Sequence, residues 1–359
     1  MENEVLGLLH EVGYSKELSE KRAKIYENAG KGVTIFERRN FGGDFDIVIG
    51  GSRGDGTGVY LDCDVDKIFV QNEVKCFDEI GIDAIDASFK TVFRLETEGI
   101  PSGYAKLRLH SMQDGADTNQ TGDILQHRIK QALTNVDGIQ YLRNDHTLCS
   151  AIGPQPGQVS NSWLHQNIVY SKVKAGPSTP YNIRIPLLQT NLELDEALAF
   201  RCSCPAIVHQ CCERVSGRQW PPTYIVQSVI SQDAYVVPVG LKDHTDENLQ
   251  WRICFTLTEI ALVQSFNDTQ IKLFAALKLV TKHCLKPICK NITTYIIKNI
   301  LFWLMEESEH SHWEEKYFNE RFTDALLYLK TSINNRELKN YMIPTRNLLL
   351  NKVSYEAML

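Results

Sequence analysis

A glycine-rich segment followed by regularly spaced acids constrains this chain more than any other feature. Residues 49–66 read Ile-Gly-Gly-Ser-Arg-Gly-Asp-Gly-Thr-Gly-Val-Tyr-Leu-Asp-Cys-Asp-Val-Asp. Side chains alternate faces along a β-strand, so Asp62, Asp64 and Asp66 would share one side of a strand over residues 60–70. Carboxylates aligned on one face repel one another unless cations lie between them. The pattern therefore indicates a site for a hard cation such as Mg²⁺, which binds through carboxylates and nucleotide phosphates.

Familiar phosphate loops and calcium loops do not fit this segment. The glycines are not followed by Lys-Ser or Lys-Thr and do not form a strict G-x-G-x-x-G, which excludes a P-loop and a dinucleotide-binding fingerprint. The acids between Asp62 and Glu73 match positions 1, 3, 5 and 12 of a calcium loop, but Lys67 stands at position 6, where the turn needs glycine. A solvated edge strand is the plain alternative to a metal site.

A third carboxylate is available on a separate predicted strand. Residues 192–200 read Leu-Glu-Leu-Asp-Glu-Ala-Leu-Ala-Phe, which places Glu193 and Asp195 on one face. Two-metal phosphoryl transfer uses carboxylates that hold both ions and help to deprotonate the attacking hydroxyl. Asp64, Asp66 and Asp195 are therefore the candidate catalytic and metal-binding residues.

The order of periodicities predicts an α+β fold with a helical part behind it. Apolar spacing over residues 4–28 indicates one or two amphipathic helices before Gly30. Strands are expected at 45–49, 60–70, 105–109, 181–188 and 192–200, with loops at 153–157 and 176–180. From Trp251 onward the spacing predicts helices at 271–285, 294–307, 313–329 and 337–341, with Pro287 and Pro344 at helix ends. We expect the 359 residues to divide into a core, 1–220, and a mostly helical unit, 221–359.

Charge and hydropathy limit the partners and the location that we expect for this protein. The net charge is −6, but residues 1–250 hold 24 Lys and Arg against 33 Asp and Glu, whereas residues 251–359 hold 14 against 11. A polyanion should therefore meet a local basic patch rather than the whole surface. The chain opens without a secretory signal pattern, and its longest apolar stretch, 292–305, is interrupted by Lys298 and too short for a bilayer. We expect a cytoplasmic protein with no membrane partner and with reduced cysteines.

A run of cysteines invites a zinc interpretation. Cys202, Cys204, His209, Cys211 and Cys212 are residue types that bind zinc. The run lacks two separated C-x-x-C pairs, and adjacent cysteines cannot easily join one tetrahedron. Buried free thiols are the favoured interpretation, and we expect no structural zinc.

A second run is basic. Lys278, Lys282, Lys286 and Lys290 recur every four residues in the helical half. Such a stripe is usually a solvated helix face, although one of these lysines could point into a cleft.

An ordered set of eight short motifs runs through the chain. They are Gly51-Ser52, Asp64-Val65-Asp66, Leu194–Ala199, Trp220-Pro221, Val237–Gly240, Trp251–Glu259, Thr294–Glu306 and Tyr341–Leu348. The set resembles the cyclic GMP-AMP synthase-like receptors, which belong to the male-abnormal family of animal nucleotidyltransferase folds. The resemblance spans nearly the whole chain, and the ordered set is far more specific than any single motif.

The resemblance implies a polymerase-β-like nucleotidyltransferase core, an N-terminal spine helix and a C-terminal helical-bundle lobe, with the active site between the lobes. It implies that Gly51 and Ser52 hold the donor triphosphate and that the three aspartates bind two Mg²⁺ or Mn²⁺ ions. The other nucleotide-binding residues that it implies are Arg252, Thr256 and Glu259 at the nucleotides, Lys278 and Thr294 at phosphate, and Tyr295 stacked on a base. Structural packing is the alternative for Arg252 and Tyr295.

Departures from the family bear on the ligands. Vertebrate DNA-sensing members carry a His/Cys zinc ribbon after the Trp-Arg motif, whereas residues 260–277 contain neither His nor Cys. We therefore expect double-stranded RNA rather than DNA as the activator. Gly50 and Cys254 stand where the family often has hydroxyl side chains, so ATP, GTP and other NTPs all stay open as substrates. The predicted nucleic-acid surface comprises Lys21, Arg22 and Lys24 of the N-terminal helix together with Lys282 and Lys286.

Two functions follow from the resemblance. The leading hypothesis is a nucleic-acid-activated enzyme that joins two NTPs into a cyclic dinucleotide second messenger in innate immune sensing, with a ligand-induced oligomer as a further option. The alternative is a non-catalytic family member that acts in binding or development, because many members of the wider family have lost the acids. The intact set of three aspartates favours the enzyme.

Overall fold

A computed structural model describes residues 2–58, 64–78, 88–113, 124–144, 168–170, 178–185 and 190–350. Helices and strands are mixed along the chain, which confirms the predicted α+β class. The N-terminal helices are α1 (Glu2–Glu11), α2 (Lys16–Phe41) and the short α3 (Gly51–Gly54), and α4 (Ile124–Ala132) lies between strands. Among the described residues, no helix is both long enough and apolar enough to cross a bilayer.

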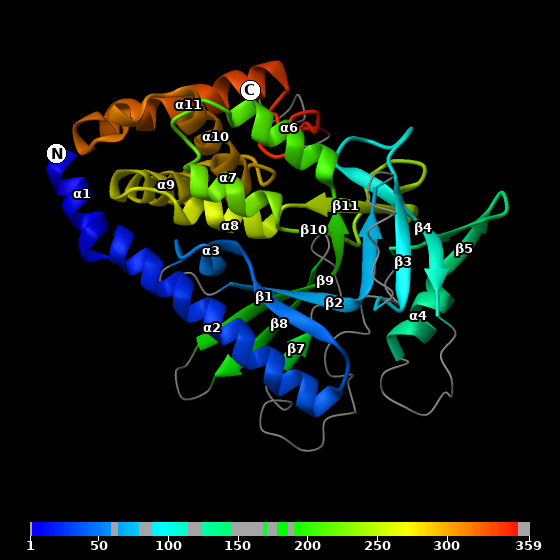
Figure 1. Cartoon of the computed structure of the whole chain (residues 1–359). Helices are drawn as coiled ribbons and strands as arrows, with labels where there is room; N and C mark the ends of the chain where they lie inside the picture. The colour runs from blue at the N-terminus through cyan, green and yellow to red at the C-terminus, as the bar shows by residue number, and fades with distance from the viewer. Residues whose placement is uncertain are drawn as a thin grey trace.

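One curled sheet forms the centre of the fold (Figure 1). Its strands are β1 (Phe45–Ile49), β2 (Val65–Phe77), β3 (Thr91–Glu96), β4 (Tyr104–Met112), β5 (Leu133–Val136), β6 (Ile139–Leu142), β7 (Ile168–Tyr170), β8 (Ser178–Ile185), β9 (Thr190–Ser203), β10 (Ala234–Val237) and β11 (Gln250–Cys254). The order is β1-β2-β3-β4-β11-β10-β9-β8-β7, and β2 also pairs with β9. The strands from β2 to β9 in this order therefore form a closed circuit of pairings, because β9 also pairs with β2. The β2–β9 pair is parallel.

Helices from the C-terminal part pack together on one side of this sheet, as Figure 1 shows. They are α6 (Pro205–Val215), α7 (Thr223–Ile230), α8 (Thr256–Gln264), α9 (Asp268–Val280), α10 (Thr294–Glu307) and α11 (Phe318–Asn335), with a π-turn η6 (Thr281–Leu285) after α9 and short 3₁₀ turns at Glu247–Leu249, His310–Trp313 and Glu315–Tyr317. Aromatic side chains pack in the core of the sheet and in the core of the helical part. Trp251 is fully buried against Phe200 at a ring distance of 5.3 Å, while Trp220, Phe302 and Tyr341 pack among the helices.

Helix α2 is longer than the sequence pattern predicts. It continues through Gly30 to Phe41, so the expected end before Gly30 is wrong. A Cβ on Gly30 would lie 2.8 Å from the backbone oxygen of Ile47, and Thr34 accepts a 2.8 Å hydrogen bond from the Ile47 N–H. Gly30 therefore allows α2 to pack closely on β1 rather than ending the helix.

Other boundaries also differ from the sequence expectation. Trp251 belongs to β11, so a division of the chain at residue 220 leaves two strands of the sheet, β10 and β11, with the helical part. Residues 337–341 are not helical because Arg336 is left-handed (φ 53°) and ends α11, well before Pro344. Ser178 to Pro180 lie in β8 rather than a loop. The loop expected at 153–157 lies outside the described residues.

We predict opposite effects for alanine at two glycines of α2. Gly30→Ala should lower the free energy of unfolding by about 1–3 kcal/mol because its Cβ meets the backbone of β1. Gly32→Ala, whose Cβ meets no atom of the described residues within 4 Å, should raise the free energy of unfolding by about 0.5–1 kcal/mol through helix propensity. Urea unfolding of both variants measures the difference, and equal stabilities would contradict the close packing of α2 on β1.

Candidate active site

Two of the predicted acids meet on neighbouring strands. In the parallel β2–β9 pair, Asp66 is the direct partner of Asp195, and Val65 is the partner of Leu194. Both carboxylates are half-buried, and Asp64 is exposed immediately before β2. Asp62 lies outside the described residues. The structure thus brings the predicted acids from two distant segments to one place.

The glycine-rich segment packs directly under Asp66. A Cβ on Gly51, whose φ is +56°, would lie 1.8 Å from the Asp66 carboxylate, so only glycine fits there. The Gly50 N–H donates a 2.8 Å hydrogen bond to the backbone oxygen of Asp66. Ser52 follows within α3, and Gly58 N–H returns to its carbonyl at 2.6 Å. The predicted phosphate loop therefore turns beside the acids.

Burial and mutual repulsion both disfavour the charged forms of the clustered acids. Burial and the nearby carboxylates of Asp195 and Asp64 raise the pKa of Asp66 to about 6. Burial and Asp64 also raise the pKa of Asp195, and the hydrogen bond that Glu193 shares with Asp64 raises the pKa of Glu193. A bound cation would relieve this repulsion, which is the electrostatic condition of a divalent metal site.

The donor types and charge at this place fit a hard divalent cation. The side chains as they stand do not enclose one: within the described ranges, no three His, Cys, Asp or Glu side chains lie close enough together to hold an ion. The calcium-loop alternative is wrong, because residues 65–77 form a continuous strand instead of a loop that enters a helix.

A buried ion pair joins the glycine-rich segment to the helices. Lys298 of α10 lies 2.9 Å from Asp55, and their side chains are 12% and 1% exposed. Burial alone would raise the pKa of Asp55, but Lys298 and Lys278 lower it below its ordinary value. Lys278 also donates to the Thr57 carbonyl at 3.4 Å. Lysines of α9 and α10 thus hold the loop that carries Ser52.

Sequence reasoning missed Asp55 and Lys298 as site residues. The one sequence feature that pointed to this pair is Lys298 itself, which interrupts the apolar run 292–305. A lysine in a buried helix needs an anionic partner, and Asp55 in the glycine-rich segment supplies it.

A second missed cluster lies beside the acids. Lys67, next to Asp66, contacts Glu196, next to Asp195, at 2.8 Å, and it contacts Glu37 of α2 at 2.9 Å. All three side chains are at most 15% exposed. This triad, Glu37–Lys67–Glu196, ties both acid-bearing strands to α2. Lys67 and Glu196 alternate with the aspartates along their strands, so the pattern that predicts the acids does not include them.

The predicted nucleotide residues lie along the neighbouring helices. Tyr295 donates a 2.8 Å hydrogen bond to Glu259, and Asn340 donates to the Tyr295 hydroxyl at 2.9 Å. Burial and the Glu259 carboxylate raise the pKa of Tyr295, so its hydroxyl stays protonated. Arg252 is half-buried on β11 near Glu259 and Tyr295. Thr256 begins α8, and Thr294 is exposed at the first residue of α10.

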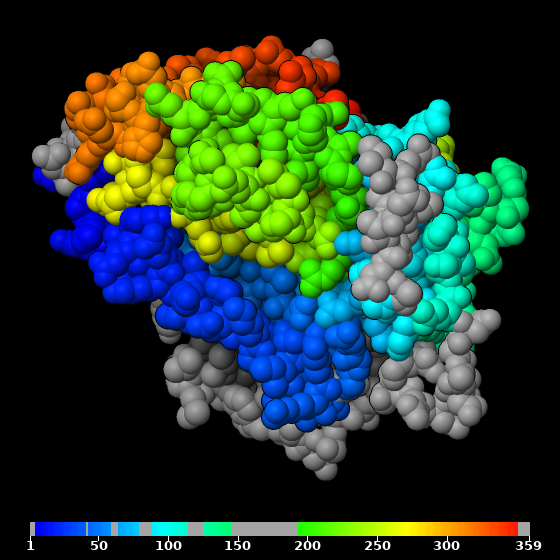
Figure 2. All heavy atoms as spheres, viewed as in Figure 1, coloured from blue at the N-terminus to red at the C-terminus, as the bar shows by residue number. Residues whose placement is uncertain are grey.

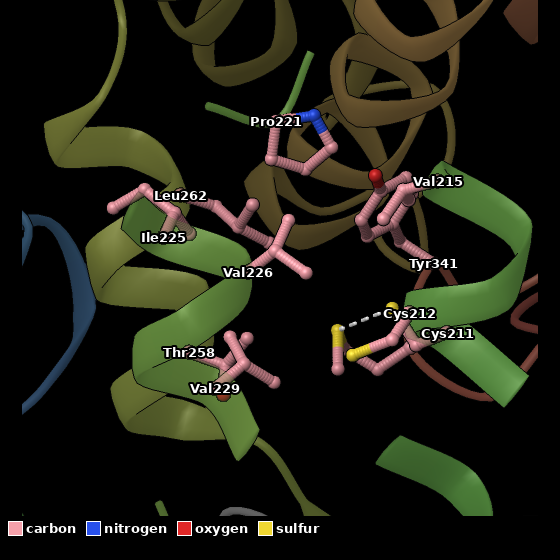
Figure 3. A pocket seen from close by; sticks show the side chains of 11 residues that line it. Cys211, Cys212, Val215, Pro221, Ile225, Val226, Val229, Thr258, Leu262 and Tyr341 are labelled. Carbon is pink, nitrogen blue, oxygen red and sulfur yellow. Dashed lines mark hydrogen bonds between the residues drawn. The ribbon is translucent and has the colours of Figure 1, made fainter. Parts of the chain in front are cut away.

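The cysteine run divides between two environments. Cys202 and Cys204 are buried with their sulfurs 3.1 Å apart, beside Cys76. Cys211 and Cys212 instead line a small apolar pocket, shown in Figure 3, where Cys211 contacts Met342 at 3.9 Å. His209 is exposed beside Glu213. The five residues of the run therefore do not converge on one point.

The predicted basic surface needs one correction. Arg22 is not available to a ligand: its guanidinium donates to the carbonyl oxygens of Gly56 and Gly13 at 2.9 and 2.8 Å. It fastens α2 to the glycine-rich segment instead. Lys21 is exposed but pairs with Glu17 at 2.5 Å. The other predicted lysines are exposed, namely Lys24, Lys282 and Lys286.

Comparison with known families reaches the C-terminal part of the chain. Residues 267–358 match the family model of the Mab-21 protein HhH/H2TH-like domain, which begins at the N-terminus of α9. The match supports the Mab-21 family, within the nucleotidyltransferase superfamily that includes the cyclic GMP-AMP synthase-like proteins. It agrees with the family resemblance drawn from the sequence motifs, over about the last quarter of the chain.

We predict that Asp66→Asn stabilises the protein in EDTA at pH 7.5. The pKa of Asp66 is raised to about 6 in the folded protein, so its charge destabilises the folded state above that pH. The penalty fades as pH falls from about 6 toward about 4, the unfolded value, where both states are protonated. The melting temperature of the variant should therefore exceed that of the wild type at pH 7.5, and the gap should close on acidification.

Asp246→Asn is the matched control for this measurement. Asp246 pairs with Lys106 at 2.7 Å, away from the acid cluster, so its loss should not stabilise the protein. An Asp66→Asn variant that melts below the wild type at pH 7.5 would contradict carboxylate repulsion at the β2–β9 pair.

Proposed function

We propose that this chain is a nucleotidyltransferase that joins two NTPs into a cyclic dinucleotide second messenger, releasing pyrophosphate, and that it acts in innate immune sensing in the cytoplasm. The observation that carries the proposal is the register pairing of Asp66 with Asp195, beside Asp64 and over the Gly51-Ser52 turn. A scaffold protein has no physical reason to keep three repelling carboxylates together at a cost in stability.

In this proposal the chain's residues position nucleotides around the acids. Asp64, Asp66 and Asp195 would hold Mg²⁺ or Mn²⁺, which neutralises phosphate charge and activates the attacking hydroxyl. The backbone at Gly51 and Ser52 would receive the donor triphosphate, with Lys278 and Thr294 toward phosphate. Arg252, Thr256, Glu259 and Tyr295 would face the nucleotides.

The hydrogen bonds of Tyr295 sharpen its proposed role. Its hydroxyl is already shared between Glu259 and Asn340. The ring face, not the hydroxyl, is therefore the part of Tyr295 that we assign to a base, and the bond to Glu259 would fix the ring's orientation.

The test is product formation from the four labelled NTPs with Mg²⁺ or Mn²⁺, in the presence of double-stranded RNA or DNA. We predict that Asp66→Asn and Asp195→Asn abolish the cyclic product, because each removes a proposed metal ligand with almost no change in volume. Asp246→Asn should leave turnover intact. Substantial product from Asp195→Asn would refute the metal assignment. An inactive wild type under every condition would favour the alternative, a non-catalytic binding or developmental protein.

The proposed activator is double-stranded RNA rather than DNA, bound by a local basic patch. Lys24, Lys282 and Lys286 are the exposed lysines of the predicted surface, whereas Arg22 serves the fold. A duplex can be bound through its backbone shape without base contacts. We expect no structural zinc in this recognition.

We predict that Lys24→Glu combined with Lys286→Glu weakens duplex RNA binding and flattens its salt dependence. Each lysine–phosphate interaction that the substitutions remove should reduce the log–log slope by about 0.9 on the B-DNA scale. Lys242→Glu, an exposed lysine outside the predicted surface, is the matched control. Fluorescence anisotropy over a salt series gives the slopes, and an unchanged slope in the double variant would show that the duplex binds elsewhere.

A further inference from the structure

Exposed apolar side chains are concentrated on the N-terminal helices. Within the described residues, fourteen large apolar side chains are exposed, and seven of them lie between Val5 and Phe36. Scattered exposed apolar residues are normal, whereas a concentration on one element marks a contact surface. The N-terminal helices therefore present an apolar surface that the proposed enzyme function does not use.

On α2 three of these side chains, together with two small residues, form a narrow stripe on the side away from the sheet. Leu18, Ile25 and Phe36 are 39%, 62% and 60% exposed, and Ala29 and Gly32 between them are exposed too. The five residues follow spacings of 7, 4, 3 and 4, which keeps them on one side of a helix for about 27 Å. In Figure 2, α2 forms a blue ridge on the surface shown.

We propose that this stripe, Leu18–Phe36 on the outward side of α2, pairs antiparallel with the same stripe of a second copy of the chain. Four of its members are symmetric about residue 27, so an antiparallel pair places Leu18 opposite Phe36 of the second copy and Ile25 opposite Ala29 of the second copy. At the centre, a large side chain thus faces a small one on both sides of the twofold axis. Gly32, with no atom near its missing side chain, lets the helices approach closely.

Charge at the ends of the stripe complements this arrangement. The same antiparallel register brings the exposed Glu17 near Arg39 of the second copy, and symmetry repeats the pair at the other end. A polyanion is a poorer fit, because acids and bases alternate on this side of α2 and Glu17, which pairs with Lys21 of its own chain at 2.5 Å, would repel phosphate groups.

The expected dimer is weak. One helix pair about 27 Å long buries less than the 1,200–2,000 Å² typical of stable complexes. We therefore expect monomer and dimer to exchange with a dissociation constant of about 10–100 µM, which makes the state of the chain depend on its concentration.

Sedimentation velocity of the full chain over a concentration series tests the proposal. Ile25→Glu should raise the dissociation constant of the dimer about tenfold or more, since it places a charge at the centre of the interface. Ile230→Glu is the matched control: Ile230 on α7 is 64% exposed, against 62% for Ile25, so its replacement should leave the dimer unchanged. Circular dichroism melts confirm that both variants fold.

A charge swap tests the register. Glu17→Arg and Arg39→Glu should each weaken the dimer several-fold, and the double variant should regain wild-type association because the pair re-forms with reversed signs. A wild type that stays monomeric up to about 100 µM, or a dimer that Ile25→Glu does not affect, overturns the proposal. Loss of duplex RNA binding in Ile25→Glu without any change in association also overturns it, and assigns the stripe to nucleic acid.

Discussion

The parallel pairing of β2 with β9 is the constraint on which the rest of the candidate site depends. It sets Asp66 against Asp195, with Asp64 nearby, and burial together with the repulsion of these carboxylates raises the pKa of Asp66. Such an arrangement is tolerable only if the surrounding structure holds the strands in place. The fold supplies this hold with lysines that pair with other acids, Asp55, Glu37 and Glu196, next to the three aspartates.

Two buried charge clusters provide that hold from different directions. Lys298 and Lys278 bind the glycine-rich segment from the helical side, through Asp55 and the Thr57 carbonyl. The Glu37–Lys67–Glu196 triad binds both acid-bearing strands to α2 from the other side. Removing one member of a buried pair leaves an uncompensated charge, so each cluster is intolerant of single changes. Except for Lys278, which we also assign to phosphate, the residues of these clusters touch no predicted ligand.

The sequence predicted the parts of the site that follow local rules. Alternation along a strand placed Asp64 and Asp66 on one face, and the glycines marked the turn beneath them. It did not identify Asp55, because an aspartate between glycines looks like an ordinary loop residue until Lys298 of a distant helix is seen beside it. The prediction that Arg22 binds nucleic acid was wrong for the same reason. Its place on a charged helix suggested an exposed side chain, but its guanidinium donates hydrogen bonds to the carbonyl oxygens of Gly56 and Gly13. Gly30 was misread because its role is contact with β1, which no local pattern encodes.

Helix α2 contributes to both the candidate site and the proposed dimer, because its inner and outer sides make different contacts. Its inner side packs on β1 and α3 and reaches the acid-bearing strands through Glu37. Its outer side carries the apolar stripe, roughly one helix diameter away, about 10 Å. Arg22 and the triad fasten α2 at two places, and Lys67 of the triad lies next to Asp66 in the strand. The helix that carries the stripe is therefore also the helix that contacts the acid-bearing strands, through Glu37 and Lys67.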